Sequence, residues 1–174
     1  MLQKNMQYGR ESLEKRLILY SPNIVNLCLD SYGKEKQRGR LYHEYTIQPM
    51  VFTTLFEAFE KMDALYDALQ FPQAATEIRD FRVDRKERER MIRESGGELA
   101  LPEHIKEELE KVEEFEKVIE QRGKEATFVI RVKFRQHSSW QGEITWVDGQ
   151  KKEYFRSALE LIKLMDSALH MQDH

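Results

Sequence analysis

Basic side chains interleaved with aromatic ones are the residues best suited to bind a ligand, and they occur in two stretches of this sequence. In one stretch, Arg131, Lys133 and Arg135 alternate with apolar residues. This period-two pattern is typical of a strand with one buried side, so we expect the three cations to share the other side. Of the two tryptophans, Trp140, beside the following turn, is the better surface candidate. Four further candidate contacts come from that turn and the next strand: His137, Ser139, Trp140 and Gln141.

The other stretch has a similar mixture of positive charge and aromatic rings. Cations follow phosphates and rings stack on bases, at roughly 1–3 kcal/mol per base, so the mixture is typical of proteins that bind single-stranded nucleic acid. The alternative is a face that meets solvent or is covered by the acidic helix predicted at residues 103–121. The candidate contacts here are Lys34, Lys36, Arg38, Arg40 and Tyr42, with Tyr32 and His43 close by in the sequence.

Catalytic and metal-binding motifs are missing from the sequence. The five histidines are spread over different predicted elements, and none has ligand spacing with the single cysteine, Cys28. His137 precedes Ser138 and Ser139, but adjacent turn residues rarely point at one another, and no third residue is evident to orient a base. We therefore expect no metal, no cofactor and no nucleophilic centre.

Two pairs of carboxylates recur at equivalent places and resemble a general acid–base pair at first sight. Glu57 and Glu160 each stand three residues after a Thr or Ser at a helix start, where they complete a capping box. Asp63 and Asp166 fall inside the helices, where we expect solvated surface positions. The sequence therefore favours a protein that is not an enzyme.

An internal repeat organises these residues. Phe52 falls on Phe155 at an offset of 103 residues, and Gly39 falls on Gly142 at the same offset, without a gap between them. Each copy predicts a strand hairpin, a further short strand and an amphipathic helix. Pro49 lacks a backbone donor where the third strand of the first copy would lie, so we expect that strand to be shorter or absent.

The predicted fold class is α+β, a duplicated strand-hairpin-(strand)-helix unit in one pseudo-twofold domain with a helical insertion. The first ββ(β)α repeat spans residues 17–72 and the second βββα repeat spans 124–170, with a charged helical insert at 73–123. Two such copies satisfy each other's apolar faces, as a symmetric dimer would. The insert either packs on the core as a helical hairpin or projects as an arm that recognises a partner.

Composition narrows the class of protein. The 174 residues include 34% charged ones, carry a formal net charge of −3 and contain a single cysteine. No apolar run approaches the roughly 20 residues that span a bilayer, and residues 1–6 lack the apolar stretch of a signal peptide. We expect a cytoplasmic protein without a membrane partner or an internal disulfide.

Two family resemblances accompany these patterns. Residues 128–169, especially the segments 137–142 and 155–161, resemble a family of small bacterial proteins without an assigned function, as do residues 62–73. Residues 27–30 followed by 37–41 are similar to the first hairpin of the PUR repeat of single-strand nucleic-acid-binding proteins. That resemblance implies strands followed by a helix, paired in one pseudo-symmetric domain. PUR repeats have four strands where this sequence predicts three.

The leading interpretation is a non-catalytic binding or regulatory module that contacts another protein. The alternative is single-stranded RNA or DNA binding through the basic and aromatic hairpin faces. The oligomeric state stays open.

Overall fold

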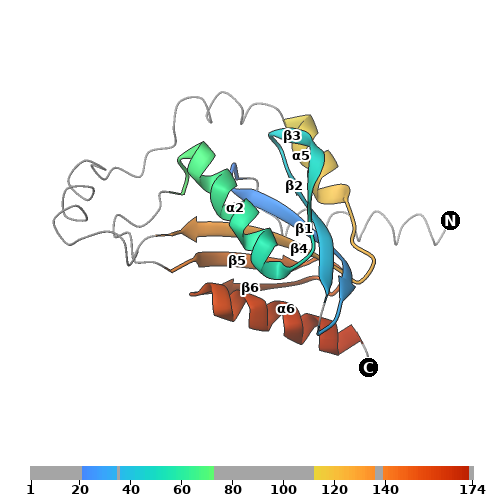
Figure 1. Ribbon diagram of the computed structural model, residues 1–174. Helices are drawn as coiled ribbons and strands as arrows, with labels where there is room; N and C mark the ends of the chain where they lie inside the picture. Colours follow the sequence, from blue (N-terminus) through green and yellow to red (C-terminus); the bar gives the residue numbers. More distant parts are fainter. Residues whose placement is uncertain (1–20, 35, 73–111, 136–138, 173–174) are drawn as a thin grey trace.

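The protein folds as an α+β structure with a six-stranded antiparallel sheet and three helices in its described residues. The computed structural model describes residues 21–34, 36–72, 112–135 and 139–172. The sheet order is β3-β2-β1-β4-β5-β6 (Figure 1). The strands are β1 (Ile24–Tyr32), β2 (Gln37–His43), β3 (Thr46–Phe52), β4 (Ala126–Phe134), β5 (Gln141–Trp146) and β6 (Lys151–Phe155), and the helices are α2 (Leu55–Leu69), α5 (Val112–Glu120) and α6 (Ala158–Gln172).

The helices α2 and α6 cover one face of the sheet, which we call the inner face. Figure 1 shows α2 crossing in front of the strands and α6 running alongside β6. Every second residue of β1 and β4 belongs to the main core under the helices, namely Val25, Leu27 and Leu29 of β1 and Ala126, Phe128, Ile130 and Val132 of β4. The largest fully buried side chains of this core are Tyr66, Phe52, Phe128, Phe155, Leu27, Leu29, Leu41, Met62, Ile130, Leu161 and Met165.

Both helices on the inner face begin at the predicted capping boxes. The hydroxyl of Thr54 accepts a hydrogen bond from the Glu57 N–H at 3.1 Å, and Ser157 accepts from the Glu160 N–H at the same distance. In a standard capping box the glutamate accepts from the N–H of the cap residue itself. Here Glu57 and Glu160 accept from the N–H of the residue before the cap, which is Thr53 and Arg156 respectively. Since free N–H groups at a helix start need acceptors, these contacts set where α2 and α6 begin.

Two glycines allow close approach between strands and buried rings. Gly39 pairs with Leu29 on one side and with Phe52 on the other. A methyl group on Gly39 would clash with the Cys28 carbonyl oxygen and lie 2.5 Å from the Phe52 ring. Gly142 pairs with Val132 and Phe155 in the same way, and a methyl group there would lie 2.9 Å from the Phe155 ring.

The prediction of a short or missing third strand in the first half is wrong. β3 has seven residues and is longer than β6, which has five. Pro49 is tolerated because β3 lies at the edge of the described sheet, where a strand needs hydrogen bonds on one side only. At the opposite edge, Lys151 and Lys152 place charge on β6, so both edges carry residues that discourage uncontrolled strand pairing.

The described part of the insert packs on the opposite face of the sheet, which we call the outer face. The side-chain amide of Asn26 donates to the carbonyl oxygens of Val118 at 2.7 Å and Gln121 at 3.0 Å. Ile119 packs against the small apolar cluster of Ile24, Val129 and Val147. The end of the predicted insert is therefore packed on the sheet, whereas residues 73–111 lie outside the described residues.

Candidate functional site

Three cations surround one carboxylate on the outer face. Glu143 accepts hydrogen bonds from Arg131 at 2.5 Å and from Lys133 at 2.7 Å, and Lys152 lies 3.1 Å from the same carboxylate. The register pairs Arg131 with Glu143 and Glu143 with Tyr154, so these residues share a face. We call Arg131, Lys133, Glu143 and Lys152 the Glu143 cluster.

The carboxylate of this cluster is ionised at neutral pH. Burial alone would raise the pKa of Glu143, whose side chain is 6% exposed. Hydrogen bonds from Lys133 and Lys152 and the charge of Arg131 outweigh that effect and lower the pKa to about 2. Three positive charges against one negative charge leave the Glu143 cluster suited to an anionic partner.

One exposed aromatic ring, that of Tyr154, borders the cluster, and a second exposed ring follows on β4. The Tyr154 side chain is 66% exposed, and the Lys133 ammonium lies 5.3 Å from its ring centroid, within the range of a cation–π interaction. Phe134 is 45% exposed. The register of β4 and β5 shifts between Val132 and Phe134, and this bulge turns Phe134 away from the helices.

The same bulge separates Arg135 from the other two predicted cations. Its side chain is 3% exposed and lies on the inner face, where it donates to Asp63 and Asp67, each at 2.8 Å. It also donates to the Pro72 carbonyl oxygen at 2.8 Å, and its guanidinium lies 5.4 Å from the Tyr66 ring centroid. The prediction of one shared face is wrong for Arg135 because an extra residue in the strand reverses the alternation.

In the first half, the candidate cations divide into a paired one and three exposed ones. Arg40 donates to both carboxylate oxygens of Asp30, at 2.7 and 2.8 Å, and to the Tyr42 hydroxyl at 2.8 Å. The hydrogen bond from Arg40 holds the pKa of Asp30 below its usual value. The three exposed cations are Lys34 and Lys36, in the β1–β2 connection, and Arg38, on β2.

Trp140 is packed against the core and is not a surface residue. Its ring is half-buried and packs against Phe59 and Tyr66, with centroids 5.6 and 5.8 Å apart. Trp140 therefore belongs to the margin of the core, which corrects its prediction as a surface residue. Ser139 donates to the Arg156 carbonyl oxygen, Gln141 pairs with Phe134 in the sheet, and His137 lies outside the described residues.

The two recurring aspartates are more than solvated surface groups. Asp63 binds the buried Arg135, as described above. Asp166 accepts a 2.7 Å hydrogen bond from the Tyr32 hydroxyl. Burial and then this hydrogen bond raise the pKa of Tyr32 to about 12. Both aspartates thus anchor a helix to the end of a central strand.

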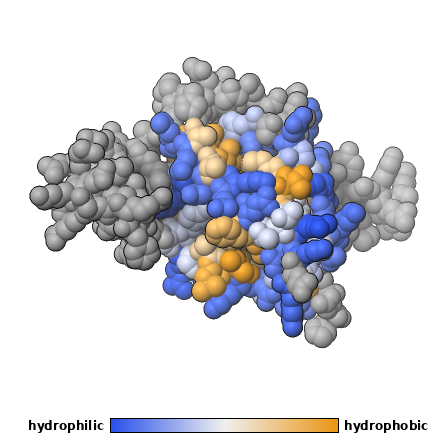
Figure 2. Space-filling view, viewed as in Figure 1, coloured by the Kyte–Doolittle hydropathy of each residue, from blue (hydrophilic) through white to orange (hydrophobic). Residues whose placement is uncertain are grey.

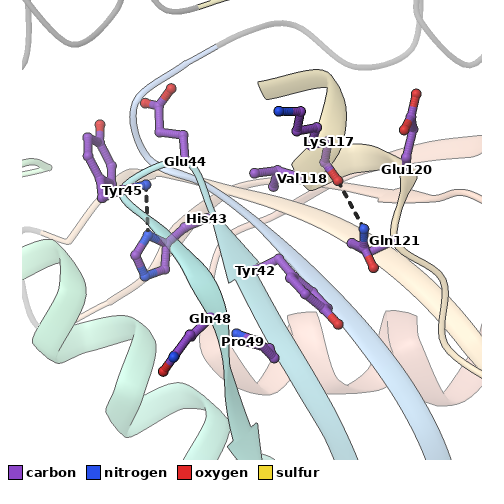
Figure 3. Close-up of a pocket in the computed structure, with 10 residues that line it drawn as sticks. All are labelled: Tyr42, His43, Glu44, Tyr45, Gln48, Pro49, Lys117, Val118, Glu120 and Gln121. Carbon is purple, nitrogen blue, oxygen red and sulfur yellow. Dashed lines mark hydrogen bonds between the residues drawn. The ribbon is translucent and has the colours of Figure 1, made fainter. Parts of the chain in front are cut away.

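A cavity of about 900 Å³ lies between the β2–β3 hairpin and α5 (Figure 3). Among the residues that line this cavity, His43 is the candidate for a general base, but burial lowers the pKa of its ring. The Tyr45 N–H donates to Nδ1 of His43 at 3.2 Å, so a neutral ring has its proton on Nε2. His43 therefore offers this cavity a donor and no free acceptor.

Exposed apolar side chains accompany the edge strands. Tyr154 on β6 is followed by Leu159 in the first turn of α6, which is 61% exposed. A groove of about 180 Å³ borders β6 and is lined on the α6 side by Leu164, Ala168 and Met171. Figure 2 shows apolar patches, divided by hydrophilic residues, on the side that carries α2 and α6.

The sequence interpretation missed Glu143, Lys152 and Tyr154. The signal that would have found them is the hairpin register, which pairs Trp146 with Lys151 and therefore Glu143 with Tyr154. Among the described residues, no three His, Cys, Asp or Glu side chains gather as metal ligands, and no helix has the length and apolar character needed to cross a membrane. No family model matches the chain, and neither the curated proteins nor the solved structures contain a match.

Proposed function

We propose that this protein is a non-catalytic binding module and that its target is another protein. The observation that carries the proposal is the position of β6 at the edge of the described sheet, beside exposed side chains with large apolar parts. Tyr154 is exposed next to Lys133 of the Glu143 cluster, and Leu159 is exposed in the first turn of α6. Burial of such side chains against a partner removes apolar area from water, and tyrosine is enriched in protein interfaces.

The internal pairing of two candidate cations, Arg135 and Arg40, favours a protein over nucleic acid. Arg135 forms ion pairs with Asp63 and Asp67, and Arg40 donates hydrogen bonds to both carboxylate oxygens of Asp30. A nucleic-acid-binding face needs cations that are free to follow phosphates. His43, with its lowered pKa and occupied Nδ1, supports a role without catalysis.

A second candidate function is single-stranded nucleic-acid binding, and the contact of Lys133 with Tyr154 favours it. An exposed ring beside a cation suits a stacked base next to its phosphate. Anisotropy of a labelled oligouridine, titrated with protein at rising salt, tests this candidate. Saturable binding that weakens steeply with salt and is lost on Lys133→Gln with Tyr154→Ala would establish it.

We also infer that the two halves are copies of one unit. The row Leu29–Gly39–Phe52 and the row Val132–Gly142–Phe155 support this inference, because each member is 103 residues from its counterpart. Tyr32 contacts Asp166 and Arg135 contacts Asp63, again at that offset. Such crossed contacts are expected from two copies related by a pseudo-twofold axis.

Photo-crosslinking tests the protein partner directly. A photoreactive benzoylphenylalanine is placed at Tyr154 or at Leu159 in the full chain in its native cells, with Glu60 as the control position. We expect discrete protein adducts from positions 154 and 159 and none from position 60, which is exposed on α2, the helix that packs on β2 and β3 at the other end of the sheet. The absence of adducts at both edge positions, or equal adducts at all three, would contradict the proposal.

A further inference from the structure

The geometry points to a specific occupant for β6: an extended segment of a partner protein in which apolar and acidic side chains alternate. This inference rests on the proposed function and adds the chemistry of the partner. Within the described sheet, β6 pairs with β5 alone, so one side of its backbone is open to a further strand. Strand addition of this kind uses main-chain hydrogen bonds for affinity and alternate side chains for specificity.

The two faces beside β6 differ in chemistry. On the outer face, Lys152 and Tyr154 lie with the Glu143 cluster, which has two positive charges in excess. On the inner face, Lys151 and Glu153 border the groove lined by α6. Side chains of an added strand point to the two faces in turn. Acidic residues would therefore meet the cations, and apolar residues would meet the groove.

The inner groove is suited to apolar side chains. Leu164, Ala168 and Met171 of α6 line it, and Met171 is 52% exposed. The opposite wall contains Trp146 and Ile144 of β5. An apolar side chain entering this groove covers Met171 and excludes water from the wall, which is favourable in proportion to the area buried.

Charge decides which strand is accepted. The excess positive charge beside β6 repels a second copy of this chain at the same edge, because antiparallel pairing of the two edges would bring both Glu143 clusters to one face. An uncharged strand would leave the excess positive charge of the Glu143 cluster without a negative partner. An acidic segment pairs with them, so attraction and repulsion together select the partner.

A designed peptide tests this inference on the full chain. The probe is a fluorescein-labelled peptide of alternating valine and glutamate, and its control has the same composition in separate valine and glutamate blocks. We expect saturable binding of the alternating peptide at least tenfold tighter than that of the block peptide. Equal binding of the two peptides, or no binding of either, would overturn the inference.

Variants and amide exchange locate the binding site. Lys152→Gln and Met171→Asp should each weaken binding of the alternating peptide at least fivefold, whereas Lys163→Gln, at an exposed position of α6, should leave it unchanged. Hydrogen exchange gives a readout independent of variant folding: amides of residues 151–155 should exchange more slowly with peptide bound. Protection at β3 in place of β6 would overturn the assignment.

The outcomes separate this inference from the proposed function. If the alternating peptide does not bind while protein adducts still form at position 154, the inference of an alternating segment is wrong and the proposed protein-binding function stands. If the adducts themselves are absent, the proposed function fails. Oligouridine binding that is lost on Lys152→Gln, without peptide binding, would assign the face to nucleic acid and overturn the inference.

Discussion

Arg135 and Asp63 form a 2.8 Å ion pair that joins the end of β4 to the middle of α2. The arginine is almost fully buried, while the aspartate side chain is 51% exposed. A buried guanidinium requires a carboxylate and further acceptors, and Asp67 and the Pro72 carbonyl oxygen provide them. This pair is therefore part of the scaffold and is unavailable to a partner.

Replacing this arginine should destabilise the fold. Arg135→Met removes the hydrogen bonds to Asp63, Asp67 and Pro72 and leaves a buried carbonyl oxygen without its donor, so we expect a loss of about 2–4 kcal/mol in the free energy of unfolding. Urea unfolding measures it. Arg38→Met, at an exposed position, is the control and should change stability by less than about 0.5 kcal/mol. Equal effects would show that Arg135 is not part of the scaffold.

The crossed contact in the other half predicts a measurable coupling. Tyr32 donates to Asp166 at 2.7 Å. A double-mutant cycle of Tyr32→Phe and Asp166→Ala should give a coupling of about 1 kcal/mol, which is typical of a partly buried hydrogen bond. Additive single effects in the same unfolding experiment would contradict this contact.

The local patterns predicted the elements well because each has a local physical cause. The period of two predicted β4, the repeat predicted β1 at the equivalent place, and the capping boxes predicted the starts of α2 and α6. The site was harder to predict. One extra residue at the β4 bulge moved Arg135 to the inner face, and no local pattern announces a bulge. Pro49 was likewise misjudged, because its effect depends on whether β3 lies at an edge.

Contacts between segments that lie far apart in the chain could not be predicted from the sequence. Glu143 gathers Arg131 from β4 and Lys152 from β6, so the cluster exists only once the strand order is known. Trp140 was predicted at the surface because it follows a turn. Its burial depends on the place where α2 brings Phe59 and Tyr66.

The interstrand glycines should tolerate no side chain. A methyl group on Gly39 or Gly142 would collide with a strand carbonyl and with a buried phenylalanine ring. Gly39→Ala and Gly142→Ala should each lower the free energy of unfolding by roughly 2 kcal/mol or more. Gly33→Ala is the matched control, because the nearest atom, the Lys36 carbonyl oxygen, lies 3.9 Å from the added methyl group. A loss at Gly33 as large as the others would contradict the close approach.

Glu143 should make the free energy of unfolding depend on pH in the acid range. Its pKa of about 2 lies below the ordinary value of 4.5, so the unfolded chain takes up this proton more readily than the folded one. The stabilisation is present above pH 4.5 and is lost as the pH falls towards 2. Acidification across this range should destabilise the wild type by roughly 1–3 kcal/mol more than Glu143→Gln, because solvent screens part of the interaction. Parallel pH curves for the two proteins would contradict the ion-pair cluster.

The most direct test of the account is the chemical identity of whatever binds beside Tyr154. A photoreactive residue at this position should form an adduct that mass spectrometry identifies as a peptide from one partner protein. The account predicts a peptide with alternating apolar and acidic residues, and the adduct should be lost on Met171→Asp. A nucleotide adduct at position 154, or no specific adduct, would contradict the claim that this sheet edge binds protein.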